Sequence, residues 1–70
     1  MSLSAYDLRR IIWAGNVLRD AARHATFASE RADDEGEVAV RCVVAASLAR
    51  TAARTLDLAD ANITRKRGKR

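Results

Sequence analysis

Apolar and small residues recur along the first half of the chain at intervals of three and four positions, the spacing of one face of an α-helix. This stripe starts with bulky residues and continues with small ones: Leu8, Ile11, Gly15, Leu18, Ala22, Ala25, Ser29 and Ala32. Ser4 stands where it can cap a helix, and Asp7, three residues later, suits the positive end of the helix dipole. The pattern predicts a helix over about residues 4–32.

An acidic segment interrupts the stripe. Residues 33–36 read Asp-Asp-Glu-Gly, a combination typical of a tight turn between two helices. Asp34 can cap the helix that follows, with Glu37 as its third residue. We therefore expect a turn over residues 33–36.

A second helical stripe follows over about residues 37–62. Its members are Val38, Cys42, Ala45, Ala49, Ala52, Leu56, Ala59 and Ile63. Between residues 38 and 49 this segment is apolar nearly all round, which is typical of a helix that is buried on more than one side. One partner helix covers only one side, so we expect the rest of the surface to meet another subunit.

These patterns predict an all-α protein, a two-helix antiparallel hairpin that dimerises into a four-helix bundle. The chain has 70 residues and one cysteine, so it lacks an internal disulfide, and self-association is the expected source of stability. Trp13 is expected to be a packing anchor. The residues expected at the dimer interface are Val38, Val40, Val43, Val44, Leu48 and Trp13.

Two alternatives to the two-helix hairpin remain open from the sequence. Gly15-Asn16 can end a short first helix, which gives three helices instead of two. Residues 38–44 are rich in β-branched side chains and suit a strand, although no other segment offers a convincing partner strand.

Positive charge is concentrated at the C-terminus. The net charge is +4, yet residues 1–64 sum to −1, from eight Lys/Arg against nine Asp/Glu. We expect residues 65–70 to form a disordered basic tail that contacts phosphates, because a concentrated basic arm attracts polyanions. Its cations are Arg65, Lys66, Arg67, Lys69 and Arg70. A solvated end without a specific partner and a nuclear-import address are the alternatives.

Two arginine pairs, Arg19/Arg23 and Arg50/Arg54, are spaced so that each pair shares one helix face. We expect Arg50 and Arg54 to add to the phosphate-contacting surface, with a solubilising surface as the alternative.

Residues that could carry chemistry are few. Cys42 lies on the apolar stripe, where a small buried side chain is the expected role, and His24 is the one candidate base. The sequence offers no paired catalytic carboxylates and no His/Cys cluster. We therefore expect no enzyme, no metal and no cofactor.

The leading hypothesis is a small nucleic-acid-associated accessory or regulatory protein, a helical homodimer whose basic arms make sequence-independent contacts with DNA or RNA. The alternative is an interaction module that docks on a larger protein partner through Val40, Val43, Val44 and Leu48. No secretory signal and no run of about 20 apolar residues is visible. We therefore expect a cytoplasmic protein without membrane contact.

Overall fold

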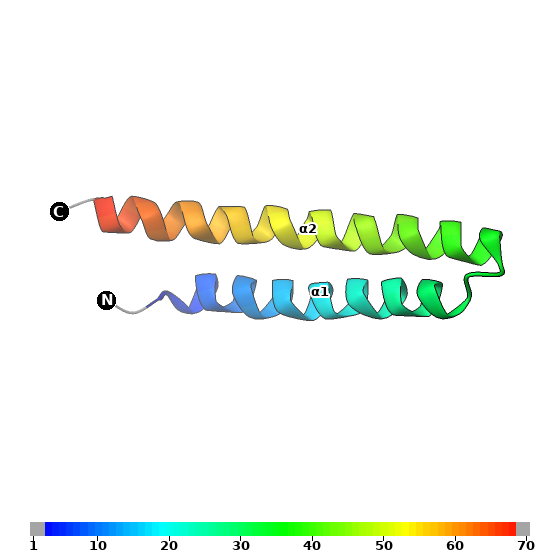
Figure 1. Ribbon diagram of the computed structural model, residues 1–70. Coiled ribbons are helices and arrows are strands. Elements are labelled where there is room, and N and C mark those ends of the chain that lie inside the picture. Colours follow the sequence, from blue (N-terminus) through cyan, green and yellow to red (C-terminus); the bar gives the residue numbers. More distant parts are fainter. Residues whose placement is uncertain (1–2, 69–70) are drawn as a thin grey trace.

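Two antiparallel helices make up the fold (Figure 1). The structure is a computed structural model that describes residues 3–68, and no strand occurs in that range. Helix α1 spans Ala5–Glu30 and helix α2 spans Glu35–Gly68. The molecule is a rod of 56 × 15 × 13 Å, with both chain ends at one end, called here the open end, and the connection at the other, the turn end. The predicted all-α hairpin is confirmed.

Both predicted helix caps are present. The backbone N–H of Asp7 donates to Ser4 Oγ at 3.1 Å, and the backbone N–H of Glu37 donates to Asp34 Oδ1 at 3.1 Å. These bonds satisfy N–H groups that the first turn of a helix leaves free. Because Asp34 caps α2 directly, the connection occupies residues 31–34, two positions earlier than predicted.

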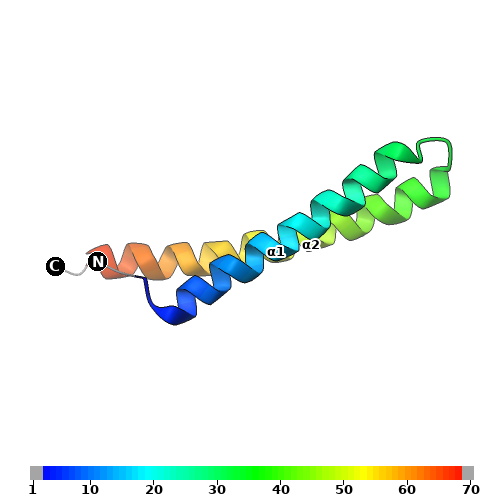
Figure 2. The same ribbon diagram turned by 90° about the horizontal axis from the view of Figure 1, so that it is seen from below.

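Neither alternative to the two-helix fold survives. Helix α1 passes through Gly15-Asn16 without a break, and residues 38–44 are helical. Alanine, leucine and arginine surround these sites, and their combined helix propensity outweighs one glycine or a run of valines. Figure 2 shows the two helices crossing near the middle of the rod, and the described range contains no third helix.

Alanine forms the contact between the helices. The buried apolar residues of the described chain are Ala14, Ala21 and Ala28 in α1 and Ala52 and Ala59 in α2. Ala14 and Ala52 are 0% exposed, and within each helix the buried alanines are seven residues apart. This is the seven-residue repeat of a coiled-coil seam, and side chains this small let the two backbones approach closely.

The stripe predicted for the first helix is displaced by one residue from this seam. Leu8 and Leu18 are 47% and 42% exposed, and Ala22 is exposed as well. The stripe predicted for the second helix, in contrast, includes the buried Ala52 and Ala59. The smallest apolar side chains of α1 therefore form its contact with α2, and the bulkier apolar side chains of α1 lie beside the seam.

Helix α2 extends further than the sequence predicted. It continues through Gly68, so residues 65–68 are helical, and a disordered tail beginning at Arg65 is wrong for this range. Arginine and lysine are good helix formers, no glycine or proline occurs between Gly36 and Gly68, and cations are favourable at the C-terminal end of a helix. Lys69 and Arg70 lie outside the described residues.

Replacing Gly36 with alanine is expected to stabilise the protein. Gly36 is helical without a positive φ, and a Cβ there would meet only Asp34 Oδ1, at 3.6 Å, an ordinary contact. We expect the free energy of unfolding to rise by about 0.5–1 kcal/mol, because alanine loses less backbone freedom on folding. Urea unfolding at one fixed protein concentration measures the change, and a decrease would argue against a helical residue 36.

Candidate nucleic-acid interface

Charge is segregated along the long axis of the rod. At the open end, residues 3–13 and 57–68 carry five Lys/Arg against three Asp/Glu. At the turn end, residues 28–42 carry two Lys/Arg against five Asp/Glu. The open end is therefore the positive pole of the molecule and the turn end its negative pole, and a polyanion is attracted to the former.

Both helices contribute to the positive pole. The first turns of α1 carry Arg9 and Arg10, and the last turns of α2 carry Arg65 and Lys66. Arg9, Arg65 and Lys66 are exposed, while Arg10 is half-buried. Of the predicted tail cations, Arg65 and Lys66 thus join two arginines from the opposite terminus. Lys69, Arg70 and the side chain of Arg67 lie outside the described residues.

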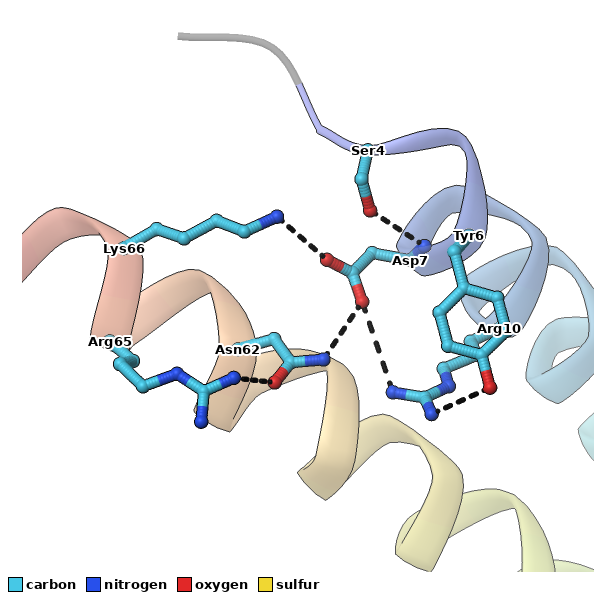
Figure 3. A network of polar contacts seen from close by, with 7 residues as sticks. All are labelled: Ser4, Tyr6, Asp7, Arg10, Asn62, Arg65 and Lys66. Atoms are coloured by element: carbon cyan, nitrogen blue, oxygen red, sulfur yellow. Dashed lines mark hydrogen bonds and ion pairs between the residues drawn. The ribbon is translucent and has the colours of Figure 1, made fainter.

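A buried carboxylate lies within this basic cluster (Figure 3). Asp7 is 2% exposed. Its Oδ1 accepts a hydrogen bond from Asn62 Nδ2 at 3.3 Å, and its Oδ2 lies 3.6 Å from Lys66 Nζ. Arg10 Nη1 is 3.9 Å from Oδ1. Asp7 therefore joins the start of α1 to the last turns of α2, and it holds part of the positive charge in place.

The neighbours of Asp7 are themselves held. Arg10 Nη2 donates to the Tyr6 hydroxyl at 2.9 Å, and its guanidinium lies over the Tyr6 ring, 4.2 Å from the centroid. Arg65 Nη2 donates to Asn62 Oδ1 at 2.6 Å. The sequence placed Asp7 at the start of the first helix but did not indicate the links to α2. The spacing in the sequence could have indicated these links, because Asp7 lies seven residues before Ala14 and so falls on the seam between the helices.

The pKa of the Asp7 carboxyl is held below its ordinary value of 3.8. The hydrogen bond from Asn62 is the largest cause, helped by Ser4, Lys66 and Arg10 and opposed by desolvation, which raises the pKa. The folded chain thus binds this proton less readily than the unfolded chain. The stabilising contribution is complete above the ordinary value and is lost as the pH falls through the lower folded value.

Asp7→Asn tests this contribution. At neutral pH the variant lacks the attraction to Lys66 and Arg10, so we expect a lower melting temperature than that of the wild type. The difference should shrink as the pH falls from about 5 to about 2, where the wild-type carboxyl is protonated too. Asp20→Asn removes an exposed acid paired with Arg23 and should change little. A difference that is constant with pH would show that the Asp7 charge does not stabilise the fold.

The arginine pairs on the shaft of the rod are separate from the positive pole. Arg19, Arg23, Arg50 and Arg54 are exposed. Arg54 lies twelve residues before Lys66, about 18 Å along α2. A role for Arg50 and Arg54 in contacting phosphates stays a prediction.

The residues predicted for the dimer interface do not gather on one face. Val40 and Val43 are 59% and 65% exposed, and Trp13, on the other helix, is 47% exposed. The remaining three are half-buried: Val38, Val44 and Leu48. Val38 falls seven residues before Ala45, on the seam spacing, and so points toward α1.

The predicted role of Cys42 as a buried side chain is wrong for the hairpin, because Cys42 is exposed beside the seam. His24 is half-buried, and its Nδ1 lies 2.8 Å from Arg41 Nη1. Arg41 also donates from Nε to Glu37 Oε1 at 2.9 Å and lies over the Phe27 ring, 4.1 Å from the centroid. His24 is therefore part of a polar and aromatic contact that links the helices near the turn.

Within residues 3–68, no group of three or more His, Cys, Asp or Glu side chains is placed to hold a metal ion. Neither α1 nor the described length of α2 is long and apolar enough to cross a bilayer. No protein family, curated protein or solved structure matches the chain. The charge distribution and the exposed apolar surface are thus the features from which a function is argued.

Proposed function

We propose that the protein is a nucleic-acid-associated accessory factor, a homodimeric four-helix bundle whose basic ends contact the phosphates of DNA or RNA. The observation that carries the proposal is the gathering of Arg9, Arg10, Arg65 and Lys66 from both helices at one pole of the rod. Contacts of this kind are made to the sugar–phosphate backbone and carry no base information. Binding is therefore independent of sequence.

Dimerisation is proposed because one hairpin buries little. Its buried apolar side chains in the described range are all alanines. The chain exposes 5415 Å², whereas a compact monomer of 7.7 kDa exposes about 4,300 Å². Exposed large apolar residues occur on both helices, Ile12 at 56% and Leu58 at 53% among them. A second copy that covers part of this surface supplies the missing core.

Binding of the full chain to fluorescently labelled duplex DNA and RNA, measured by anisotropy over a series of salt concentrations, tests the proposal. Each neutralised phosphate contributes a slope of about −0.9 in a plot of log affinity against log salt. Five tail contacts per chain therefore predict a slope of about −4 to −5. Absence of binding at low ionic strength, or binding that salt does not weaken, would rule the function out.

The exposed valines favour a second function, an interaction module that docks on a larger protein. Ala39, Val40, Val43 and Val44 line a shallow apolar depression on α2. A photo-crosslinking residue at position 43 tests it in cells that make the protein. Adducts to a larger protein at this position, absent with the crosslinker at the exposed Ala61, support docking, and self-adducts alone refute it.

A further inference from the structure

We propose that the second copy docks on one flank of the hairpin, here named the apolar flank, and that the two hairpins run in opposite directions. The turn end of one copy then lies against the open end of the other. The apolar flank consists of the positions one or four residues after a residue of the alanine seam. Its largest members are Leu8, Ile11 and Leu18 on α1 and Leu56 and Ile63 on α2. The docking surface rests on the proposed homodimer, to which it adds a face and an orientation.

Helix geometry places these residues on one side. In two antiparallel helices, positions one or four residues after a seam residue lie on one side of the pair, and positions one or four residues before it lie on the other. The contact between Phe27 and Arg41, 4.1 Å from guanidinium to ring centroid, identifies the second side, because Phe27 is one residue before Ala28 and Arg41 is four residues before Ala45. Leu8 and Leu18 on α1 lie on the opposite side, with the matching positions of α2.

The two sides differ in chemistry. The side marked by Phe27 carries exposed apolar side chains as well, such as Trp13 and Leu58. These are mixed with ionic groups from both helices, among them Arg10, Arg31 and Arg41. Between residues 8 and 63, where the side chains are described, the apolar flank has one charged residue between the seam and its outer edge, Asp60. Covering the apolar flank therefore removes apolar area from water and desolvates almost no charge, whereas covering the other side desolvates several ionic groups. The apolar flank is the side that a second copy covers at the lower cost.

The area is sufficient for a stable dimer. The hairpin exposes 5415 Å², about 1,100 Å² more than a compact monomer of its mass. A specific interface of standard size buries about 800 Å² on each partner. An interface of this size with one second copy therefore covers most of the excess.

Charge selects the direction. Among the described residues, the turn end carries two Lys/Arg against five Asp/Glu, and the open end carries five against three. Opposite directions bring each negative pole beside a positive pole, whereas the same direction brings like poles together. A twofold axis across the rod gives the first arrangement and keeps the interface self-complementary.

The sizes of the side chains select the same direction. On the apolar flank, bulky residues lie toward the open end, Leu8, Ile11 and Ile63 among them. Toward the turn end its members are small, with Ala22 and Ala25 on α1 and Ala39, Cys42 and Ala46 on α2. In opposite directions the bulky half of one copy packs on the small half of the other, which fills space evenly. In the same direction bulky residues meet bulky ones and a gap opens between the small ones.

Leu18→Glu tests the face, with two matched controls of similar exposure in the hairpin. Leu18 is 42% exposed, Trp13, on the opposite side of α1, is 47%, and Val40, on the outer face of α2, is 59%. Sedimentation equilibrium should show that Leu18→Glu weakens dimerisation at least 100-fold, because it places a charge in the buried interface. Trp13→Glu and Val40→Glu place their charges outside the interface and should stay dimeric. The proposed docking face would be wrong if all three variants weakened dimerisation equally, if only a control variant weakened it, or if Leu18→Glu had no effect.

The direction is measured in a folded dimer, independently of those variants. Cys42→Ala with Ala32→Cys leaves one label site, in the exposed turn. Pulsed electron paramagnetic resonance between two spin labels should give roughly 40–50 Å, because the turns lie at opposite ends of a rod 56 Å long. A distance under about 25 Å, some two helix diameters, would show that the hairpins run in the same direction.

These measurements use the protein without nucleic acid. A dimer with a different face or direction overturns the docking surface and leaves the phosphate contacts standing. Loss of DNA and RNA binding by a dimer of the expected geometry overturns the proposed function and leaves the docking surface standing.

Discussion

Replacing Arg65, Arg67, Lys69 and Arg70 together with glutamine should weaken binding to duplex DNA about 4,000-fold at about 0.1 M salt. At that concentration each neutralised phosphate multiplies the affinity by about 8, since affinity varies with roughly the −0.9 power of salt per contact. The salt slope should fall by about 3 to 4. Lys66 is kept because it pairs with Asp7, so the link between the two helices at the open end remains.

The matched control replaces Arg19, Arg23, Arg50 and Arg54, which removes the same four charges from the shaft of the rod. If Arg50 and Arg54 both contact phosphates, this control loses about 60-fold, the effect of two contacts. Equal losses in the two variants would show that net charge governs binding and that the open end is no binding site. Circular dichroism should show the same helix content in both variants.

Ala52→Leu should destabilise the hairpin by about 3 kcal/mol, a large part of the stability of so small a core. Ala52 is 0% exposed, at a point where the two helices approach closely. Leucine and alanine have similar helix propensities, so the change in the free energy of unfolding reports packing. The extra side-chain atoms force the helices apart and loosen the contacts of the neighbouring seam alanines.

Ala61→Leu is the control for the seam, because Ala61 is exposed on the outer surface of α2. We expect its free energy of unfolding to stay within about 0.5 kcal/mol of the wild type. Chemical denaturation of both variants at one concentration gives the comparison. Wild-type stability of Ala52→Leu would mean that the alanine seam is not the contact that holds the helices together.

The sequence predicted the two helices and both caps, because these depend on local chemistry. Ser4 and Asp34 each place an oxygen where the first turn of a helix leaves N–H groups free. The helix ends were less predictable. A run of cations indicated a disordered tail, but arginine and lysine also favour helix, and no glycine or proline occurs between Gly36 and Gly68.

The register of the seam could not be predicted from hydrophobicity. Two neighbouring stripes of α1 are apolar, and the one with the larger side chains, Leu8 and Leu18, appeared to be the better core. The hairpin uses the other, because Ala14 and Ala21 allow close approach while the leucines do not. Asp7 gave a misleading signal as well, since a carboxylate is rarely buried unless a partner such as Lys66 lies near it.

At the positive pole, the sequence located the tail cations but not their neighbours. Arg65 and Lys66 follow from the charge run at the C-terminus. Their contacts with Asn62 and Asp7 depend on how far α2 extends and on which residues of α1 lie opposite it. Neither is encoded in a local pattern, so only the folded hairpin shows that part of the tail is attached to the start of α1.

The central claim is that a hairpin whose helices meet through alanines needs a second copy to cover its apolar flank. The mass of the full chain in solution tests this claim most directly. Sedimentation equilibrium at micromolar concentration, without nucleic acid, should give twice the 7.7 kDa of the chain. A single stable species of 7.7 kDa with full helix content would contradict it.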